Sequence, residues 1–573
     1  MNSNGDDEDE ERRAIQAEAG TGSRRAPAPR RARPLRDTRL TIRLDPGEPH
    51  IAADRAVEAL RNDPDLYQRD GSLVHVTPTA DDESTRSGRK RSIALGTPQI
   101  VVMAAQTLYV RITAQSKWER FDERKGEYVR TEPPDRIVKA ISTRKHWPGI
   151  RRLLGILEAP SLRSDGTVLE EPGYDDETGY LYIPNTEFPA VPQFPAQDEA
   201  RAALAQLEDV FIDFPYIGDA DRSVAIAALL TLVARPAIDG ATPAFLFDSN
   251  APGSGKSLQA SAIVAVATGR PGGNQSYPED PNELDKILGA VALEGARFVN
   301  FDNIVGRFGR GTLDRCISAV DSVSLRVLGK SEQRTMPWRT VILGSGNNIE
   351  VGADAYRRVL LGRINTPYED AEQRPISNYK HPERYGRLLD HVIAKRPSLI
   401  VAALTLLRAF IVAGRPAQVG TMAGFERWAE LVPAAIVWAG GADPLRCRPV
   451  GEANHDPKRD AMRTILESWS RLDSLGQGLT IRSLIELLFT KERLRGEAAP
   501  DGLEDMRAAI QDLVATRPGQ QPDAKKLGDQ FRHARGRNVG GKMIDAAAGA
   551  QRGATRWVVC AVPVPAAEPN TAR

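Results

Sequence analysis

The sequence predicts an α/β core, preceded by a smaller α+β domain and followed by a helical domain that ends in a strand. Three apolar runs indicate the core, because each reads as a buried strand that leads into polar residues, at 243–247, 296–301 and 340–343. Residues 258–268 read as a helix that follows the first of these strands. A strand, a loop and a helix in this order are typical of an α/β unit.

Length and composition limit the class of protein. The 573 residues suggest about three or four units, at roughly 150 residues per domain. Lys and Arg number 77 and Asp and Glu number 76, which gives a net charge of +1. This near-neutral balance excludes neither nucleic acid nor protein partners, because a local basic stripe is enough to bind phosphate.

The cysteines and the apolar runs indicate the compartment. Cys316, Cys447 and Cys560 are scattered and form no CxxC pair, which argues against a zinc ribbon or a disulfide scaffold and favours a reducing cytoplasm. No uninterrupted apolar run approaches the ~20 residues that cross a bilayer. We therefore expect a soluble, cytoplasmic protein without membrane contact.

Changes in composition suggest the domain boundaries. The expected divisions are a charged tail at 1–40, an α+β domain at 41–188, a Pro-rich linker at 189–199, the α/β core at 200–370, a helical lid and connector at 371–457, a C-terminal domain at 458–562 and a short tail at 563–573. The first tail joins an acidic and a basic block, which read as a solvated segment in preference to a nucleic-acid-contacting arm.

The α+β domain is predicted from a mixture of periods. Short alternating runs at 73–76 and 107–112 indicate strands, and residues 53–61 indicate a helix. The segment 159–182 is rich in carboxylates and could hold a metal ion. Its Asp-Gly and Pro-Gly pairs indicate turns, which is the interpretation that we favour.

The most informative motif is the loop 250–257, of sequence NAPGSGKS, between a predicted strand and a predicted helix. Glycines allow backbone N–H groups to surround nucleotide phosphates at a helix N-terminus, Lys256 adds a positive charge, and Ser257 offers a hydroxyl to Mg²⁺. The usual pattern begins with Gly, whereas this chain has Asn250, a residue type that tolerates the left-handed conformation. The expected phosphate-binding residues are Asn250, Pro252, Gly253, Ser254, Gly255, Lys256 and Ser257.

Two polar strand ends follow the loop. Asp302 follows the apolar run 296–301 and can hold Mg²⁺ together with Ser257. Asn347, which we favour over Asn348, follows the run 340–343 and can position an attacking water beside the γ-phosphate. An ordinary turn residue at a strand end is the alternative in both cases.

Three arginines come shortly after the second polar strand end. An arginine that reaches a neighbouring subunit's γ-phosphate would stabilise transition-state charge in trans. We select Arg357 and Arg358 as candidates, with Arg363 as a third, and surface arginines without such a role are the alternative.

The order of loop, Asp strand, Asn strand and arginines resembles the AAA+ division of P-loop NTPases. The sequences FDN, GNN and RRV are most similar to the helicase or primase-helicase ATPases of bacteriophages and integrated mobile elements, which are related to superfamily III helicases. The resemblance covers roughly residues 50–560. It includes four segments ahead of the core, at 69–74, 147–148, 162–167 and 172–175.

The resemblance implies that ATP binds between the subunits of a hexamer, and that a β-hairpin between the Asp and Asn strands grips DNA. The matching interval is 324–335, where Lys330 is expected to contact the DNA backbone with support from Arg326 and Arg334. A solvated surface turn is the alternative.

This chain departs from the family at Asn303, where many AAA+ proteins have a glutamate that acts as the catalytic base. Asn cannot accept a proton but can orient water, so hydrolysis would be slow or would use another carboxylate, such as Glu294 or Asp321. No consensus primase polymerase motif is present in residues 41–188, so priming is not expected.

The C-terminal domain resembles a winged helix in the order of its predicted elements. Basic residues lie on one predicted helix and at its exit. This helix could enter the major groove or lie along phosphates, or it could present a solvated charged face. The residues expected to bind DNA there are Lys525, Lys526, Arg532, Arg535 and Arg537.

The sequence thus predicts a P-loop NTPase core of AAA+ type with an N-terminal α+β domain and a C-terminal winged-helix-like domain. The expected function is that of an ATP- and Mg²⁺-dependent DNA helicase or translocase for replication of a phage or mobile element. Its expected partners are single-stranded or forked DNA, further copies of itself in a hexamer, and other replication proteins. The alternatives are an ATP-switched initiator or loader, and a DNA-binding regulatory protein with a decayed ATPase.

Overall fold

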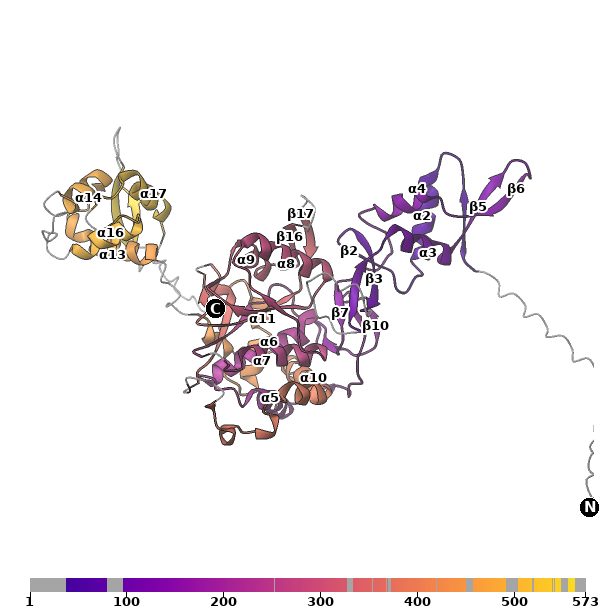
Figure 1. Ribbon diagram of the computed structural model, residues 1–573, viewed down its shortest axis with the longest axis horizontal. Coiled ribbons are helices and arrows are strands. Elements are labelled where there is room, and N and C mark those ends of the chain that lie inside the picture. Colours follow the sequence, from indigo (N-terminus) through magenta and orange to yellow (C-terminus); the bar gives the residue numbers. More distant parts are fainter. Residues whose placement is uncertain are drawn as a thin grey trace, which may run out of the picture. The chain divides into compact units, whose positions relative to one another are not determined.

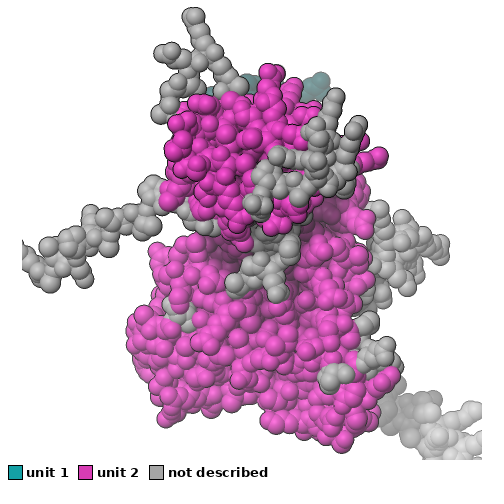
Figure 2. Space-filling view, turned by 90° about the vertical axis from the view of Figure 1, so that its left-hand side faces the viewer, with its two compact units in different colours: residues 1–64, 104–142 teal, residues 65–103, 143–573 magenta. Residues whose placement is uncertain are grey.

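The computed structural model describes residues 38–79, 96–251, 253–326, 333–352, 354–366, 368, 373–418, 420–449, 457–490, 503–517, 520–537, 539, 542–547 and 555–561. Pro252, Lys330 and the terminal residues 1–37 and 562–573 lie outside these residues. The chain divides into two compact units, and the second contains most of it (Figure 2). Residues 38–64 and 104–142 belong to unit 1, and the other described residues belong to unit 2.

Unit 1 is a three-stranded sheet with helices packed against it. Its strands are β1 (Leu40–Leu44), β5 (Ser116–Asp122) and β6 (Glu127–Thr131), and its helices are α2 (Pro49–Leu60), α3 (Ala105–Gln115) and α4 (Asp135–Ser142). β1 runs parallel to β5, and β6 runs antiparallel to β5. Helix α2 contacts β1 and α3 contacts β5, and Ile42 and Trp118 are buried in those strands.

The prediction of a strand at 107–112 is wrong, because these residues lie in α3. Leu108 and Ile112 are its buried side chains. They are four residues apart and therefore lie on one face of a helix, so the helical period outweighs the apparent alternation. The predicted helix at 53–61 and the predicted strand at 73–76 are confirmed by α2 and β3 (Ser72–Pro78).

Unit 2 begins with small sheets. Their strands are β2 (Tyr67–Arg69), β3, β4 (Pro98–Val102), β7 (Gly155–Leu157), β8 (Ser161–Leu162), β9 (Val168–Leu169), β10 (Gly173–Asp175) and β11 (Tyr180–Tyr182). Buried Arg69 donates hydrogen bonds to the carbonyl oxygens of Leu153 and Ala292, at 3.1 and 2.9 Å. The interval 41–188, expected to be one domain, is therefore divided, and part of it is hydrogen-bonded to the core.

Two carboxylates of 159–182, those of Asp165 and Asp175, serve turns, as we predicted. Asp165 accepts hydrogen bonds from the backbone N–H and the hydroxyl of Thr167, at 2.8 and 2.7 Å. Asp175 accepts from Arg163 at 2.8 Å and from the Thr178 hydroxyl at 2.6 Å. Each carboxylate is satisfied by neighbours close in sequence, which is the chemistry of turns.

The core of unit 2 is a five-stranded parallel sheet. Its strands are β12 (Ala244–Ser249), β13 (Asn274–Ser276), β14 (Phe298–Ile304), β18 (Val341–Asn347) and β20 (Val359–Ile364). They pair in the order β13-β14-β18-β12-β20, so β18 separates β12 from β14. All six residues of β12 are buried, as expected for a parallel sheet that is covered on both faces. The predicted α/β core is therefore confirmed.

Helices α6 (Asp219–Val233) and α7 (Lys256–Thr268) contact this sheet, and α5 (Gln197–Phe211), α10 (Leu388–Val412) and α12 (Val432–Trp438) pack against these helices. The other helices of the core are α8 (Pro281–Glu294), α9 (Gly311–Ile317) and α11 (Glu426–Ala429). Figure 1 shows α5, α6, α7 and α10 gathered on one side of the core and α8 with α9 on the other. Trp428 is fully buried and donates a hydrogen bond to the Thr231 hydroxyl at 2.8 Å, so it belongs to the core.

The C-terminal elements form a core of their own. They are α13 (Pro457–Leu472), β21 (Leu479–Thr480), α14 (Ile481–Leu488), α16 (Glu504–Leu513), α17 (Ala524–Ala534), β22 (Lys542–Ala546) and β23 (Arg556–Ala561). The strands make a small antiparallel sheet in the order β21-β23-β22. Trp469, Phe531 and Trp557 pack together inside it. Across the described residues, no helix is both long and apolar enough to span a membrane.

Candidate functional site

The loop 250–257 joins β12 to α7, and its glycines are required by its geometry. Gly253 and Gly255 have φ of 71° and 97°, in the left-handed region that favours glycine. A Cβ atom on Gly255 would also lie 2.9 Å from Cε1 of Phe214. Helix α7 begins at Lys256, so its first backbone N–H groups have no partner within the helix and can bind an anion.

The structural role of Asn250 differs from the expected tolerance of the left-handed conformation. Its φ is not positive, so tolerance of the left-handed conformation does not explain its presence. Its side-chain amide donates to the Thr366 carbonyl oxygen at 3.0 Å, and its side-chain oxygen accepts from the Thr366 backbone N–H at 3.1 Å. Asn250 thus fastens the start of the loop to the segment that follows β20.

The side chain of Lys256 turns back into the loop that precedes α7. Its ammonium donates hydrogen bonds to the Ala251 carbonyl oxygen and to the Ser254 hydroxyl, both at 3.1 Å. Burial lowers the pKa of this ammonium, and the carboxylates of Asp248 and Asp302 offset part of the effect. A cation held in a concave loop of N–H groups suits the phosphates of a nucleotide.

Asp302 is the centre of a compact polar cluster at the end of β14. Its Oδ1 accepts hydrogen bonds from the hydroxyls of Ser257 and Ser345, at 2.5 and 2.6 Å. Its Oδ2 accepts from the Asn274 amide at 3.0 Å. Burial raises the pKa of the Asp302 carboxyl, but these hydrogen bonds outweigh burial and hold the pKa below its ordinary value.

The same cluster fits a magnesium ion. Ser257 and Asp302 offer a hydroxyl and a carboxylate, which are hard oxygen ligands, and Mg²⁺ usually completes its shell with waters and phosphate oxygens. The sequence predicts that Ser257 and Asp302 act together, although they are 45 residues apart in the chain. In the structure they form a hydrogen bond. Ser345 and Asn274, which also contact Asp302, were not predicted, because nothing in their local sequence distinguishes them from other polar residues at strand ends.

Asn303 follows Asp302 in an irregular part of β14. Its φ is 53°, and the pairing of β14 with β18 shifts register between Phe301 and Ile304. Among non-glycine residues, Asn is one of those that adopt this conformation most readily, which gives a backbone reason for Asn at this position. Its backbone N–H donates to the Asp302 carboxylate at 3.0 Å, and its side chain is exposed.

Asn347 ends β18 opposite Ser249, the last residue of β12. Both Asn347 and Asn348 are exposed, and Asn348 has a φ of 50°. Because β18 lies between β12 and β14, its end lies between the loop and the Asp302 cluster. A role for either amide beside a bound phosphate, and the choice of Asn347 over Asn348, stay predictions.

The arginines after β18 do not join this cluster within one chain. Arg357 is exposed and lies over the Tyr356 ring, 5.5 Å from its centroid. Arg358 donates to the Ser318 hydroxyl at 2.7 Å and to the Asp354 carbonyl oxygen. A role in trans would require a second subunit and stays a prediction for both residues.

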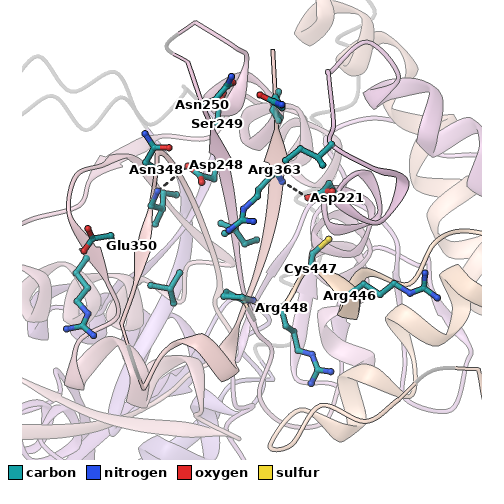
Figure 3. Close-up of a pocket in the computed structure, with 18 residues that line it drawn as sticks. Asp221, Asp248, Ser249, Asn250, Asn348, Glu350, Arg363, Arg446, Cys447 and Arg448 are labelled. Carbon is teal, nitrogen blue, oxygen red and sulfur yellow. Dashed lines mark hydrogen bonds between the residues drawn. The ribbon is translucent and has the colours of Figure 1, made fainter. Parts of the chain in front are cut away.

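Arg363, the third candidate, lines a cavity of about 860 Å³ at the carboxyl ends of β12, β18 and β20 (Figure 3). Asp248 and Asn250 line the same cavity, and burial raises the pKa of the Asp248 carboxyl. Three further arginines line it, namely Arg307, Arg446 and Arg448. They come from distant parts of the chain, so sequence reasoning did not group them.

A smaller cavity of about 160 Å³ lies on the other flank of the loop, where Gly253, Ser254 and Gly255 line it together with Phe214 and Tyr379. Arg374 holds Tyr379 in place: its guanidinium lies 4.0 Å from the ring centroid and donates to the Asp213 carbonyl oxygen at 2.5 Å. An aromatic cavity beside a phosphate loop can take a planar base. Sequence reasoning missed it, because residues 371–457 were considered only as a helical connector.

The predicted hairpin is present in its described part, and its contact with DNA stays a prediction. β16 (Ser322–Arg326) and β17 (Gln333–Pro337) pair antiparallel, with Arg326 opposite Gln333 and Arg334 opposite Leu325. Lys330, which we placed at its tip, lies outside the described residues.

The predicted C-terminal DNA contacts lie on and after α17. Lys525 and Lys526 are exposed in its first turn, where Asp523 caps their backbone N–H groups. Arg532 pairs with Asp529, and Arg535 pairs with Asp545 at 2.6 Å, whereas Arg537 is exposed after the helix. The two ion-paired arginines would have to exchange these carboxylates for phosphates in order to contact DNA.

Comparison with known proteins gives distant structural likenesses only. No protein-family model matches the sequence, and no curated protein matches it. The apo structure of the NrS-1 C-terminal region is similar with a TM-score of 0.33 and 11% identity, over 79% of this chain and 98% of that one. A JCV helicase with a small molecule bound is similar with a TM-score of 0.17 and 13% identity, over 35% of this chain and 69% of that one.

Proposed function

We propose that this protein is a Mg²⁺- and ATP-dependent DNA helicase or translocase with a core of AAA+ type. The observation that carries the proposal is the contact between Ser257 and Asp302, at 2.5 Å, directly beside a glycine loop that holds Lys256 at the start of α7. Together these groups provide a phosphate cradle, a positive charge and two magnesium ligands.

The strand order supports hydrolysis at this site. Because β18 is inserted between β12 and β14, the amide at its end lies where a water could attack the γ-phosphate. When bound, Mg²⁺ would neutralise charge on the phosphates. Lys256 would bind the phosphates, Ser257 and Asp302 would hold the ion, and Asn347 would orient the water.

The exposure of the site supports assembly. Asn303, Asn347 and Arg357 are exposed in the single chain, so a neighbouring subunit could complete the site and supply a cation in trans. We therefore include a homo-oligomer, with six subunits, in the proposal.

Two regions support DNA as the substrate. The β16–β17 pair carries Arg326 and Arg334 near its tip, and α17 and the residues that follow it carry five basic residues that we predicted to contact DNA. Phosphate contacts by Lys and Arg bind DNA without reading its sequence, which suits movement along a strand. The helices and small antiparallel sheet of residues 457–561 are compatible with a winged-helix domain.

The proposal is tested by the ATPase activity of the full-length protein. We expect hydrolysis that requires Mg²⁺ and that accelerates when single-stranded DNA is added. The absence of hydrolysis with both Mg²⁺ and DNA present would contradict the proposal. Hydrolysis without any response to DNA would favour the switch-type initiator instead.

The aromatic cavity beside the loop gives a separate prediction. Tyr379→Ala should weaken ATP binding by about tenfold, because base stacking on an aromatic ring contributes ~1–3 kcal/mol. Affinity for inorganic tripolyphosphate, which has no base, should not change. Calorimetric titration of both ligands checks this, with Tyr109→Ala on α3 of unit 1 as the matched tyrosine control. Equal weakening of both ligands would show that Tyr379 supports the loop and does not hold the base.

A further inference from the structure

Within unit 1, described helices cover one face of the sheet, and no described element of the unit covers the other face, which we call the open face. The covered face carries Ile42 and Trp118, which are 1% and 2% exposed, and helices α2 and α3 contact strands β1 and β5. Successive side chains in a strand point to opposite faces. The neighbours Thr41, Arg43, Lys117 and Glu119 therefore belong to the other face.

Two aromatic rings form a pair on this open face. Phe121 of β5 lies directly opposite Tyr128 of β6, with ring centroids 5.4 Å apart and planes at 71°. The two residues are 49% and 39% exposed. Figure 1 shows that β5 and β6 extend past the helices of the same unit. A paired set of large rings without cover on the outer side of a sheet is unusual for a surface that only faces water.

Positive charge surrounds the rings. The Arg43 guanidinium lies 4.3 Å from the centroid of the Tyr128 ring, and Lys117 and Arg130 share the same face by strand alternation. Among the strand positions of this face that are paired in the sheet, one carries a carboxylate, Glu119. It forms an ion pair with Arg43 at 3.4 Å. Three cations against one carboxylate leave a charge of +2 beside two exposed rings.

We propose that this open sheet face binds single-stranded DNA, with bases stacked on Phe121 and Tyr128 and phosphates held by Arg43, Lys117 and Arg130. Aromatic side chains are sequence-tolerant stacking platforms, and cations beside them follow the backbone. In duplex DNA the bases are stacked on one another and cannot lie flat on these rings, so the face should prefer single strands. The choice of DNA over RNA rests on the proposed function. The inference that this face binds a single-stranded nucleic acid rests only on its aromatic rings and its cations.

Photocrosslinking tests this proposal directly. The full-length protein is mixed with a 30-nucleotide oligo(dT) that carries 5-iodouracil, without nucleotide and with EDTA, and the crosslinked peptides are mapped. We expect crosslinks at Phe121 or Tyr128. Because ATP and Mg²⁺ are absent, failure of the proposed ATPase would leave this result unchanged. The absence of any crosslink in residues 104–142 would overturn the proposal.

Binding by variants provides the second measurement. Phe121→Ala should weaken oligo(dT) binding by about tenfold, and Phe121→Trp should retain it. Arg130→Ala should reduce the dependence of log Kd on log salt concentration by about one. The matched controls are Val110→Ala, an exposed apolar residue of α3, and Arg120→Ala, which is on the other face of β5. Both should bind as the wild type does.

Other occupants of the face would give different results. If Phe121→Ala binds oligo(dT) like Val110→Ala but changes the oligomeric mass in solution, the face is a protein contact and the proposal is overturned. An equal loss of affinity for oligo(dT) and for a duplex of the same length in Phe121→Ala would also overturn it. Tighter binding to oligo(rU) than to oligo(dT) would overturn the choice of DNA.

Discussion

Replacement of Lys256 by alanine is expected to lower the rate of ATP hydrolysis by about 10²–10³-fold. The reason is electrostatic: Lys256 is the cation within the loop, and removing one group aimed at developing charge typically has an effect of this size. Hydrolysis is measured at saturating ATP and Mg²⁺, and nucleotide binding is measured separately by calorimetry.

The control for this variant is Lys286→Ala. Lys286 lies on α8, is 52% exposed and pairs with Glu283, so its loss should leave hydrolysis unchanged. A Lys256→Ala protein that binds and hydrolyses ATP as the wild type does would show that the loop is not the nucleotide site.

Replacement of Asp302 by asparagine is the second large effect that we expect. The carboxylate accepts hydrogen bonds at both oxygens, from Ser257 and Ser345 at one and from Asn274 at the other. An amide has one acceptor oxygen, so it would turn its NH₂ group toward a donor, and it lacks the charge that holds Mg²⁺. Hydrolysis should fall by about 10²-fold or more.

A titration of hydrolysis against Mg²⁺ concentration checks this prediction. The Asp302→Asn protein should need more Mg²⁺ for its residual activity, whereas Asp198→Asn, at a 92% exposed position on α5, should behave as the wild type does. An unchanged Mg²⁺ requirement in Asp302→Asn would mean that the ion is held elsewhere.

The core could be predicted because its signals are local. The three apolar runs correspond to β12, β14 and β18. The motif that joins β12 to the start of α7 consists of eight consecutive residues. The contact between Ser257 and Asp302 could also be foreseen, because Ser257 comes shortly after β12, Asp302 lies near the carboxyl end of β14, and these two ends are at the same edge of the sheet.

The remainder depends on contacts between distant residues. Asn250 was noticed as an exception, but its reason is the pair of hydrogen bonds to Thr366, which is 116 residues away. The aromatic cavity joins Phe214 to Tyr379, and neither residue has a motif around it. Helix α3 was mistaken for a strand, because a six-residue window is too short to distinguish the two periods.

The most direct test of the account is ATP-driven strand displacement on forked DNA by the full-length protein. We expect the wild type to separate the strands with ATP and Mg²⁺, and to fail with a non-hydrolysable ATP analogue or when Lys256 is replaced by alanine. Separation that proceeds equally well with the analogue, or no separation by a protein that hydrolyses ATP in response to DNA, would contradict the coupling of this site to movement along DNA.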